Sequence, residues 1–118
     1  MSEPLAQVMS ERRGGVRVVA VTGEVDLSNA VALEGEIMLQ SADAGGVALD
    51  LSELGFMDSA GVALLQRLAR TLRESDRGLR LVAPASSPVG RLVGLTGLEA
   101  LIPRDERVED AVAALVVG

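Results

Sequence analysis

The sequence predicts a small α/β domain in which helices pack on a mixed, mostly parallel sheet with an N-terminal antiparallel hairpin. Short apolar segments such as GVRVVAVTG (Gly15–Gly23) and GVALDLS (Gly46–Ser52) alternate with longer segments of helical periodicity. Strands that alternate with helices require crossover connections, which make neighbouring strands parallel. At 118 residues, 48% of them apolar, the chain can build one core, so we expect one domain over residues 1–118.

The first third of the chain predicts the hairpin and a first helix. Leu5–Glu11 suits an edge strand, and the RRGG turn at Arg12–Gly15 joins it to the strand at Gly15–Gly23. The segment SNAVALEGEIMLQSAD follows, with Ser28 as its expected helix cap. Its apolar positions at helical spacing are Ala30, Leu33 and Ile37.

The rest of the chain predicts further strand-helix units. A buried strand at Gly46–Ser52 precedes a helix that begins near Ser59, and GLRLVAP is a strand ended by Pro84. The apolar face of that helix comprises Val62, Leu65, Leu68, Ala69 and Leu72. SSPVGRLVGLTGL then predicts a short helix, EALIP a short final strand, and DERVEDAVAALVV a last helix. That last helix should start at Asp105 and Glu106, and its buried stripe should be Val108, Val112 and Leu115.

The composition excludes several chemistries. The chain has no histidine, no cysteine and no lysine, since all 11 basic residues are arginine. Ser-His-Asp and Cys-His catalysis, histidine metal sites, Schiff bases and a P-loop lysine are therefore absent. A net charge of −6 and a single aromatic residue disfavour nucleic-acid binding. No uninterrupted apolar run is long enough to cross a bilayer, and the start MSEPLAQVMSERR lacks the basic-then-apolar order of a signal peptide, so we expect a cytoplasmic protein.

Polar residues follow the predicted strands at three junctions, which should meet at the carboxyl edge of the sheet. They are Asp26-Leu27-Ser28-Asn29, Asp58-Ser59 and Ser86-Ser87-Pro88. Either Asp58 or Ser59 could cap the helix that follows, and capping is the common role of both residue types. Phosphoserine would also be favoured there, because a helix N-terminus attracts negative charge.

Three motifs resemble one family. FMDSAGVALL is similar to the phosphoacceptor segment of STAS domains in bacterial anti-sigma-factor antagonists. TGEVDLSNA resembles the family's Gly-Glu-Leu-Asp segment, and SSPVGRLVGLTGLEALI resembles its Ser-Pro-x-Val-x-Arg-Leu and Thr-Gly-Leu pieces. The three occur in the family's order and span about Gly15–Ile102.

The resemblance implies a non-enzymatic partner switch without a cofactor. Unphosphorylated, the domain would bind an anti-sigma factor that is also a serine kinase, and so free a sigma factor for transcription. Phosphorylation of Ser59, which we take as both cap and phosphoacceptor, would release it, and a phosphatase could restore it. The expected partner-binding residues are Asp26, Asn29, Phe56, Asp58, Ser59, Ala60, Gly61 and Ser87.

Other readings stay open at this stage. Ala60 stands where the family's antagonists usually carry a second hydroxyl, and Asp-Ser-Ala-Gly also resembles the STAS adaptor subunit of a bacterial phospholipid-transport complex. Phe56 could be an exposed anchor or a buried residue under the helix. Arg67, Arg70, Arg73 and Arg77 could bind an acidic partner, although a solvated helix face is the commoner arrangement. An enzyme that uses the carboxylates of Asp26 and Asp58 is the least favoured interpretation. Glu24 and Asp26 supply only two carboxylates without a loop rich in further ligands, so we expect no metal site.

Overall fold

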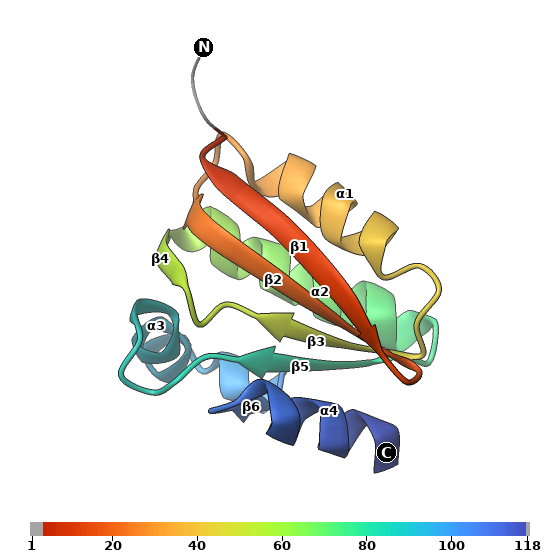
Figure 1. Ribbon diagram of the computed structural model, residues 1–118. Coiled ribbons are helices and arrows are strands. Elements are labelled where there is room, and N and C mark those ends of the chain that lie inside the picture. Colours follow the sequence, from red (N-terminus) through yellow and green to blue (C-terminus); the bar gives the residue numbers. More distant parts are fainter. Residues whose placement is uncertain (1–3, 118) are drawn as a thin grey trace.

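Six strands form one mixed sheet in the computed structural model, which describes residues 4–117 (Figure 1). The strands are β1 (Ala6–Arg13), β2 (Val16–Val25), β3 (Gly46–Asp50), β4 (Leu54–Met57), β5 (Gly78–Val82) and β6 (Arg104–Asp105). The helices are α1 (Ala30–Gln40), α2 (Ser59–Glu74), α3 (Pro88–Thr96), the 3₁₀ turn η1 (Leu98–Ala100) and α4 (Val108–Val117). The predicted α/β class with a hairpin and parallel strands is confirmed.

The hairpin of β1 and β2 forms because a glycine pair fits its tight turn. Arg13 pairs with Val16 across Gly14 and Gly15, and Gly14 has a positive φ of 63° that an L side chain rarely adopts. The two strands then pair antiparallel along the whole of β1. The predicted turn at Arg12–Gly15 is therefore confirmed, with β1 reaching Arg13.

The long strand β2 has two different parallel neighbours along its length. Its first half pairs with β3, in register Val16 to Gly46, and its second half pairs with β4, in register Val25 to Met57. The register shifts between Gly23 and Glu24 in the second half. The remaining sheet order is β3-β5-β6. Strand β4 was not predicted, although its end carries the Asp58-Ser59 junction.

Alternation along the strands builds a core on each face of the sheet. Val47 and Leu49 of β3 face the larger core, which α1, α2 and α3 cover, whereas Ala48 between them faces a smaller core under α4 (Figure 1). The α2 residues that are buried are Gly61, Leu64, Leu65, Leu68, Ala69 and Leu72. Most of the predicted face of α2 is thus confirmed, with Val62 at its partly buried margin. In α4 the predicted stripe packs beside Ala111, which is fully buried.

Two predictions for the last third of the chain are wrong. EALIP forms no strand: η1 and the turn after it place Leu98 and Ile102 in the core, and the Ile102 amide donates to the Leu98 carbonyl at 2.8 Å. The last helix does not start at Asp105 and Glu106. Asp105 belongs to β6, and its carboxylate accepts a 2.7 Å bond from Arg80 Nε of β5. That ion pair holds Asp105 in the strand, and the helix begins only at Val108.

Gly90 allows α3 to lie directly on the chain that leads into it. A Cβ at this position would lie 1.9 Å from the Pro84 carbonyl oxygen, whereas a Cβ at Gly94, one turn later, would meet no atom within 4 Å. Gly90→Ala should therefore lower the free energy of unfolding by about 1–3 kcal/mol. Gly94→Ala should be neutral or stabilising by up to about 1 kcal/mol. Urea denaturation of both variants tests this, and equal stability of the two would contradict the close contact.

Candidate functional site

The ends of β2 and β4 bring two of the predicted junctions together. Val25 pairs with Met57, and the Asp58 amide donates to the Val25 carbonyl at 3.3 Å. Asp26 and Asp58 therefore follow neighbouring parallel strands at the carboxyl edge of the sheet. Because their positions are fixed by the backbone pairing, the two carboxylates belong to one surface.

Asp58 caps α2, and Ser59 does not. Asp58 Oδ1 accepts from the amides of Ala60 at 2.8 Å and Gly61 at 3.4 Å, with the extended backbone that a cap requires. Ser59 is the first helical residue, so its side chain lies one position too late for this role, and the prediction that it caps the helix is wrong. Ser59 is exposed to solvent, whereas Asp58 is partly buried.

Gly61 lets the first turn of α2 approach the sheet closely. A Cβ at Gly61 would lie 2.0 Å from Met57 Cγ and 3.3 Å from Val25 Cγ1. Any side chain here would push the helix start away from the two strands that position it. The predicted site residue Gly61 is thus buried beneath Ser59, and Ala60 packs partly against the same core.

The loop after β2 is closed by its own side chains. Asp26 Oδ1 accepts from the Ser28 hydroxyl at 2.5 Å and from the Ser28 amide at 2.8 Å, and these bonds hold the pKa of Asp26 below its usual value. Asn29 accepts from the Asp26 amide and donates to the Glu24 carbonyl, both at 2.9 Å. Ser28 therefore stabilises the Asp26 carboxylate, and the prediction that it caps α1 is wrong. Asn29 occupies the cap position of α1, where it forms no side-chain capping bond.

Two apolar side chains lie beside these carboxylates. Phe56 of β4 is 48% exposed, which decides between the exposed and buried alternatives. Leu27, between Asp26 and Ser28, is 82% exposed. Leu27 was not predicted as a site residue, although a leucine in a polar loop without helical or strand partners is a signal that could have found it. The surface around Ser59 is therefore apolar and acidic.

Ser87 lies at the third junction and caps α3. Its hydroxyl oxygen accepts from the Gly90 amide at 3.0 Å and donates to the Pro84 carbonyl at 2.7 Å. Helix α3 packs against β4, which places this junction at the same side of the sheet. Within residues 4–117, however, Ser87 forms no hydrogen bond with Asp58 or Ser59.

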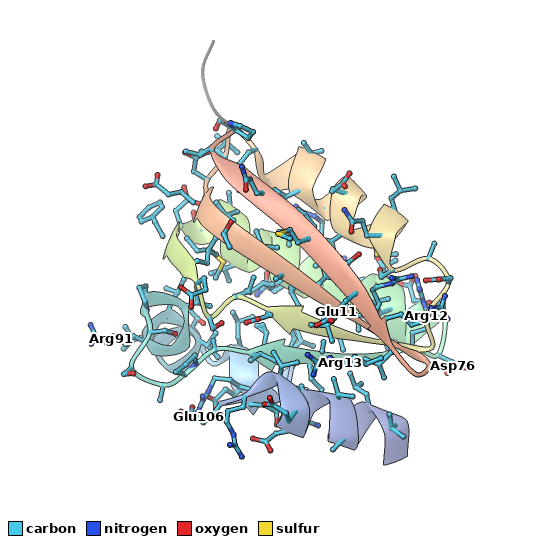
Figure 2. The ribbon with its side chains drawn as sticks, viewed as in Figure 1. Glu11, Arg12, Arg13, Asp76, Arg91 and Glu106 are labelled. Atoms are coloured by element: carbon cyan, nitrogen blue, oxygen red, sulfur yellow. The ribbon has the colours of Figure 1, made fainter. Side chains whose placement is uncertain are left out.

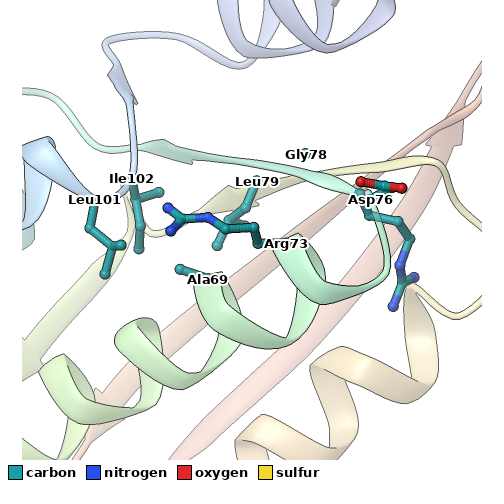
Figure 3. Close-up of a pocket in the computed structure, with 8 residues that line it drawn as sticks. Ala69, Arg73, Asp76, Gly78, Leu79, Leu101 and Ile102 are labelled. Carbon is teal, nitrogen blue, oxygen red and sulfur yellow. The ribbon is translucent and has the colours of Figure 1, made fainter.

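A cleft of about 350 Å³ lies at the other end of α2, away from Ser59. The Arg73 side chain extends across it toward Leu101 and Ile102 (Figure 3). None of the predicted site residues lines it. Two of the four arginines predicted as a possible docking face hold the fold together: Arg67 Nε of α2 donates to Glu34 at 2.7 Å, and Arg77, which follows α2, donates to the Ser41 carbonyl at 2.9 Å.

The described part of the chain contains no group of three or more Asp or Glu side chains placed to hold a metal ion. Over the same residues, 4–117, no helix combines the length and apolar character needed to cross a membrane.

Comparison with known proteins identifies relatives over nearly the whole chain. The chain is 27% identical over 113 residues to an anti-sigma F factor antagonist of Paenibacillus polymyxa, covering 94% of this chain and 96% of that protein. It is 31% identical over 93 residues to an anti-sigma-B factor antagonist of Staphylococcus epidermidis, covering 77% of this chain and 84% of that protein.

Solved structures share the fold. A crystal structure of an anti-sigma factor antagonist from Mycobacterium paratuberculosis superposes with a TM-score of 0.82 at 32% identity, covering 98% of this chain and 99% of that one. The structure of the murine anion transporter Slc26a9 contains a similar fold, with a TM-score of 0.76 at 17% identity, covering 92% of this chain and 19% of that one. The STAS domain family model matches residues 7–111. The chain belongs to the STAS domain family.

Proposed function

We propose that this protein is an anti-sigma-factor antagonist that acts as a phosphorylation-controlled partner switch in the cytoplasm. Unphosphorylated, it binds an anti-sigma factor that is also a serine kinase, and phosphorylation of Ser59 releases it. The observation that carries the proposal is the exposed Ser59 at the first position of α2, next to the capping residue Asp58. Relatives described as anti-sigma-factor antagonists support this role over that of a transport adaptor.

The exposed surface around Ser59 suits a protein partner with an apolar centre and a basic rim. Phe56 and Leu27 offer apolar contact area, and Asp26 supplies a carboxylate that stays ionised at neutral pH. Apolar side chains of this exposure release water when a partner covers them. The carboxylates favour arginine or lysine on the partner and disfavour acidic proteins.

A phosphate on Ser59 would not be neutralised by the groups around it. The amides of Ala60 and Gly61, which could bind an anion at the start of α2, are already occupied by Asp58 Oδ1. The ion pairs within residues 4–117 do not involve Asp26 or Asp58. Phosphorylation adds about −1.5 to −2 charges to this acidic surface. The switch then works by repulsion and lost complementarity, with the fold unchanged.

Ala60 makes Ser59 the single hydroxyl in the first turn of α2. The Ala60 side chain packs partly against the core, and its amide donates to Asp58. Within this turn a kinase therefore has one acceptor. A phosphatase that removes the phosphate would restore the binding form.

The phosphoacceptor is tested by intact-mass measurement after incubation with the cognate kinase and ATP. We expect the wild-type protein to gain one phosphate and Ser59→Ala to gain none, because Ser59 is the exposed hydroxyl at the helix start. Ser87→Ala is the matched control and should gain one phosphate, since its hydroxyl caps α3. Equal phosphate on wild type and Ser59→Ala, or none on wild type with an active kinase, would refute the role of Ser59.

The capping role of Asp58 predicts that stability depends on a side-chain oxygen at this position rather than on its negative charge. Asp58→Ala should lower the free energy of unfolding by about 1 kcal/mol, because the amides of Ala60 and Gly61 lose their acceptor. Asp58→Asn retains a capping oxygen and should remain much closer to wild type. Chemical denaturation of the two variants provides the measurement, and identical losses would show that the cap is not the stabilising contact.

A further inference from the structure

β1 is an edge strand whose outer backbone groups have no partner within residues 4–117. The two-residue turn makes Arg13 and Val16 a hydrogen-bonded pair, and this pairing recurs at every second residue. The Leu5 carbonyl accepts from the Glu24 amide at 3.1 Å, so Leu5 and the odd-numbered residues of β1 direct their backbone groups toward β2. The amides and carbonyls that point outward are therefore those of Ala6, Val8, Ser10 and Arg12.

A groove of about 650 Å³ runs between this edge and α1, and the helix also carries exposed apolar side chains. Ala32 and Glu36 of α1 line the groove together with Val8 of β1. Leu39 lies on the same side of the helix, one turn beyond Glu36, and is 73% exposed. One turn before Leu39, a Cβ added to Gly35 would have no atom within 4 Å. An exposed leucine beside an open groove marks a surface that a partner can cover.

We propose that the free edge of β1 and the outer side of α1 bind a second copy of this chain. The two β1 strands would pair antiparallel about a two-fold axis at Ser10, which joins the two sheets into one. The same axis keeps both α1 helices on one face of the joined sheet, so that the Leu39 side chains meet near the axis. One surface patch supplies both halves of the contact, as a two-fold interface requires.

Charge excludes two registers of this pairing and supports the one centred on Ser10. An axis at Glu11 or at Arg12 would place identical charges directly opposite each other, which is destabilising. An axis at Ser10 instead places Arg12 opposite Val8 of the second copy, and Val8 shares its groove with Glu36. The charged side chains Glu11, Arg12 and Arg13 gather at the hairpin end of β1 (Figure 2). Arg12 can turn to that Glu36, because its present partner Asp43 is also held by Arg17 at 2.8 Å.

The dimer would leave the Ser59 surface free. Ser59 lies at the carboxyl edge of the sheet, whereas the proposed contact runs along the side of β1. Each dimer would therefore present two identical binding surfaces, which strengthens binding to a dimeric partner through effective concentration. The groove meets the switch surface only at Asn29, which lines it, so either proposal can fail without the other.

Sedimentation equilibrium over a range of concentrations tests the dimer. We expect wild type to approach twice the monomer mass of 12.2 kDa as concentration rises. Ser10→Pro removes one outward amide while leaving the β1–β2 bonds intact, and should weaken the dimer by about tenfold or more. Ser10→Ala, which retains that amide, should dimerise like wild type. Leu39→Glu should also weaken the dimer, whereas Leu95→Glu, at an equally exposed position on α3, should not.

A cysteine placed at the axis tests the register. Because the chain has no cysteine, Ser10→Cys introduces a single thiol. Opposed residues of a hydrogen-bonded pair lie about 5.5 Å apart at Cα, within the range of a disulfide. Mild oxidation should link Ser10→Cys into a covalent dimer and leave Gln7→Cys unlinked. A wild type that stays monomeric at every concentration would overturn the proposal, as would a dimer that Ser10→Pro and Leu39→Glu leave unchanged.

Discussion

The candidate site depends on one residue, Asp58, which joins three elements through two groups. Its amide donates to the Val25 carbonyl and so fixes the end of β4 beside β2, while its carboxylate accepts from the first amides of α2. Gly61 lets the helix start on the strands without a gap, because a side chain there would collide with Met57. The position of Ser59 follows from these contacts: it is the next residue, held on a rigid helix and facing solvent. The same carboxylate occupies the amides that could otherwise bind a phosphate.

The fold class could be predicted from the sequence because its signals are local. A few neighbouring residues are enough to indicate each structure: the Arg-Arg-Gly-Gly turn, the β-branched run of β2 and the apolar face of α2. β4 could not be found in this way, because it is four residues long and has exposed Gly55 and Phe56 between buried ends. It exists only by pairing with the second half of β2. Likewise Asp105 has the composition of a helix start, but a distant arginine, Arg80, holds it in a strand.

The site was predictable to a similar extent. Capping chemistry singled out Asp58 and Ser59, but which of them caps was decided by the backbone at the strand end. Ser28 was expected at a helix start and instead bonds to Asp26, because a serine two residues after an aspartate can close a local turn. The exposure of Leu27 and the bare outer side of α1 depend on tertiary packing. In α1 the periodicity revealed the buried stripe, whereas the exposure of Val31 and Leu39 follows only from the packing.

The proposed switch acts by repulsion at an unchanged fold. It requires that the acidic surface of Asp26 and Asp58 gains charge at Ser59 without a basic side chain to neutralise it. The most direct test is a calorimetric titration of the cognate anti-sigma factor with the unphosphorylated and the Ser59-phosphorylated protein, after circular dichroism has shown that both are equally folded. We expect the phosphorylated form to bind at least about a hundredfold more weakly, a loss of roughly 2.7 kcal/mol. Equal affinity of two equally folded forms would contradict it.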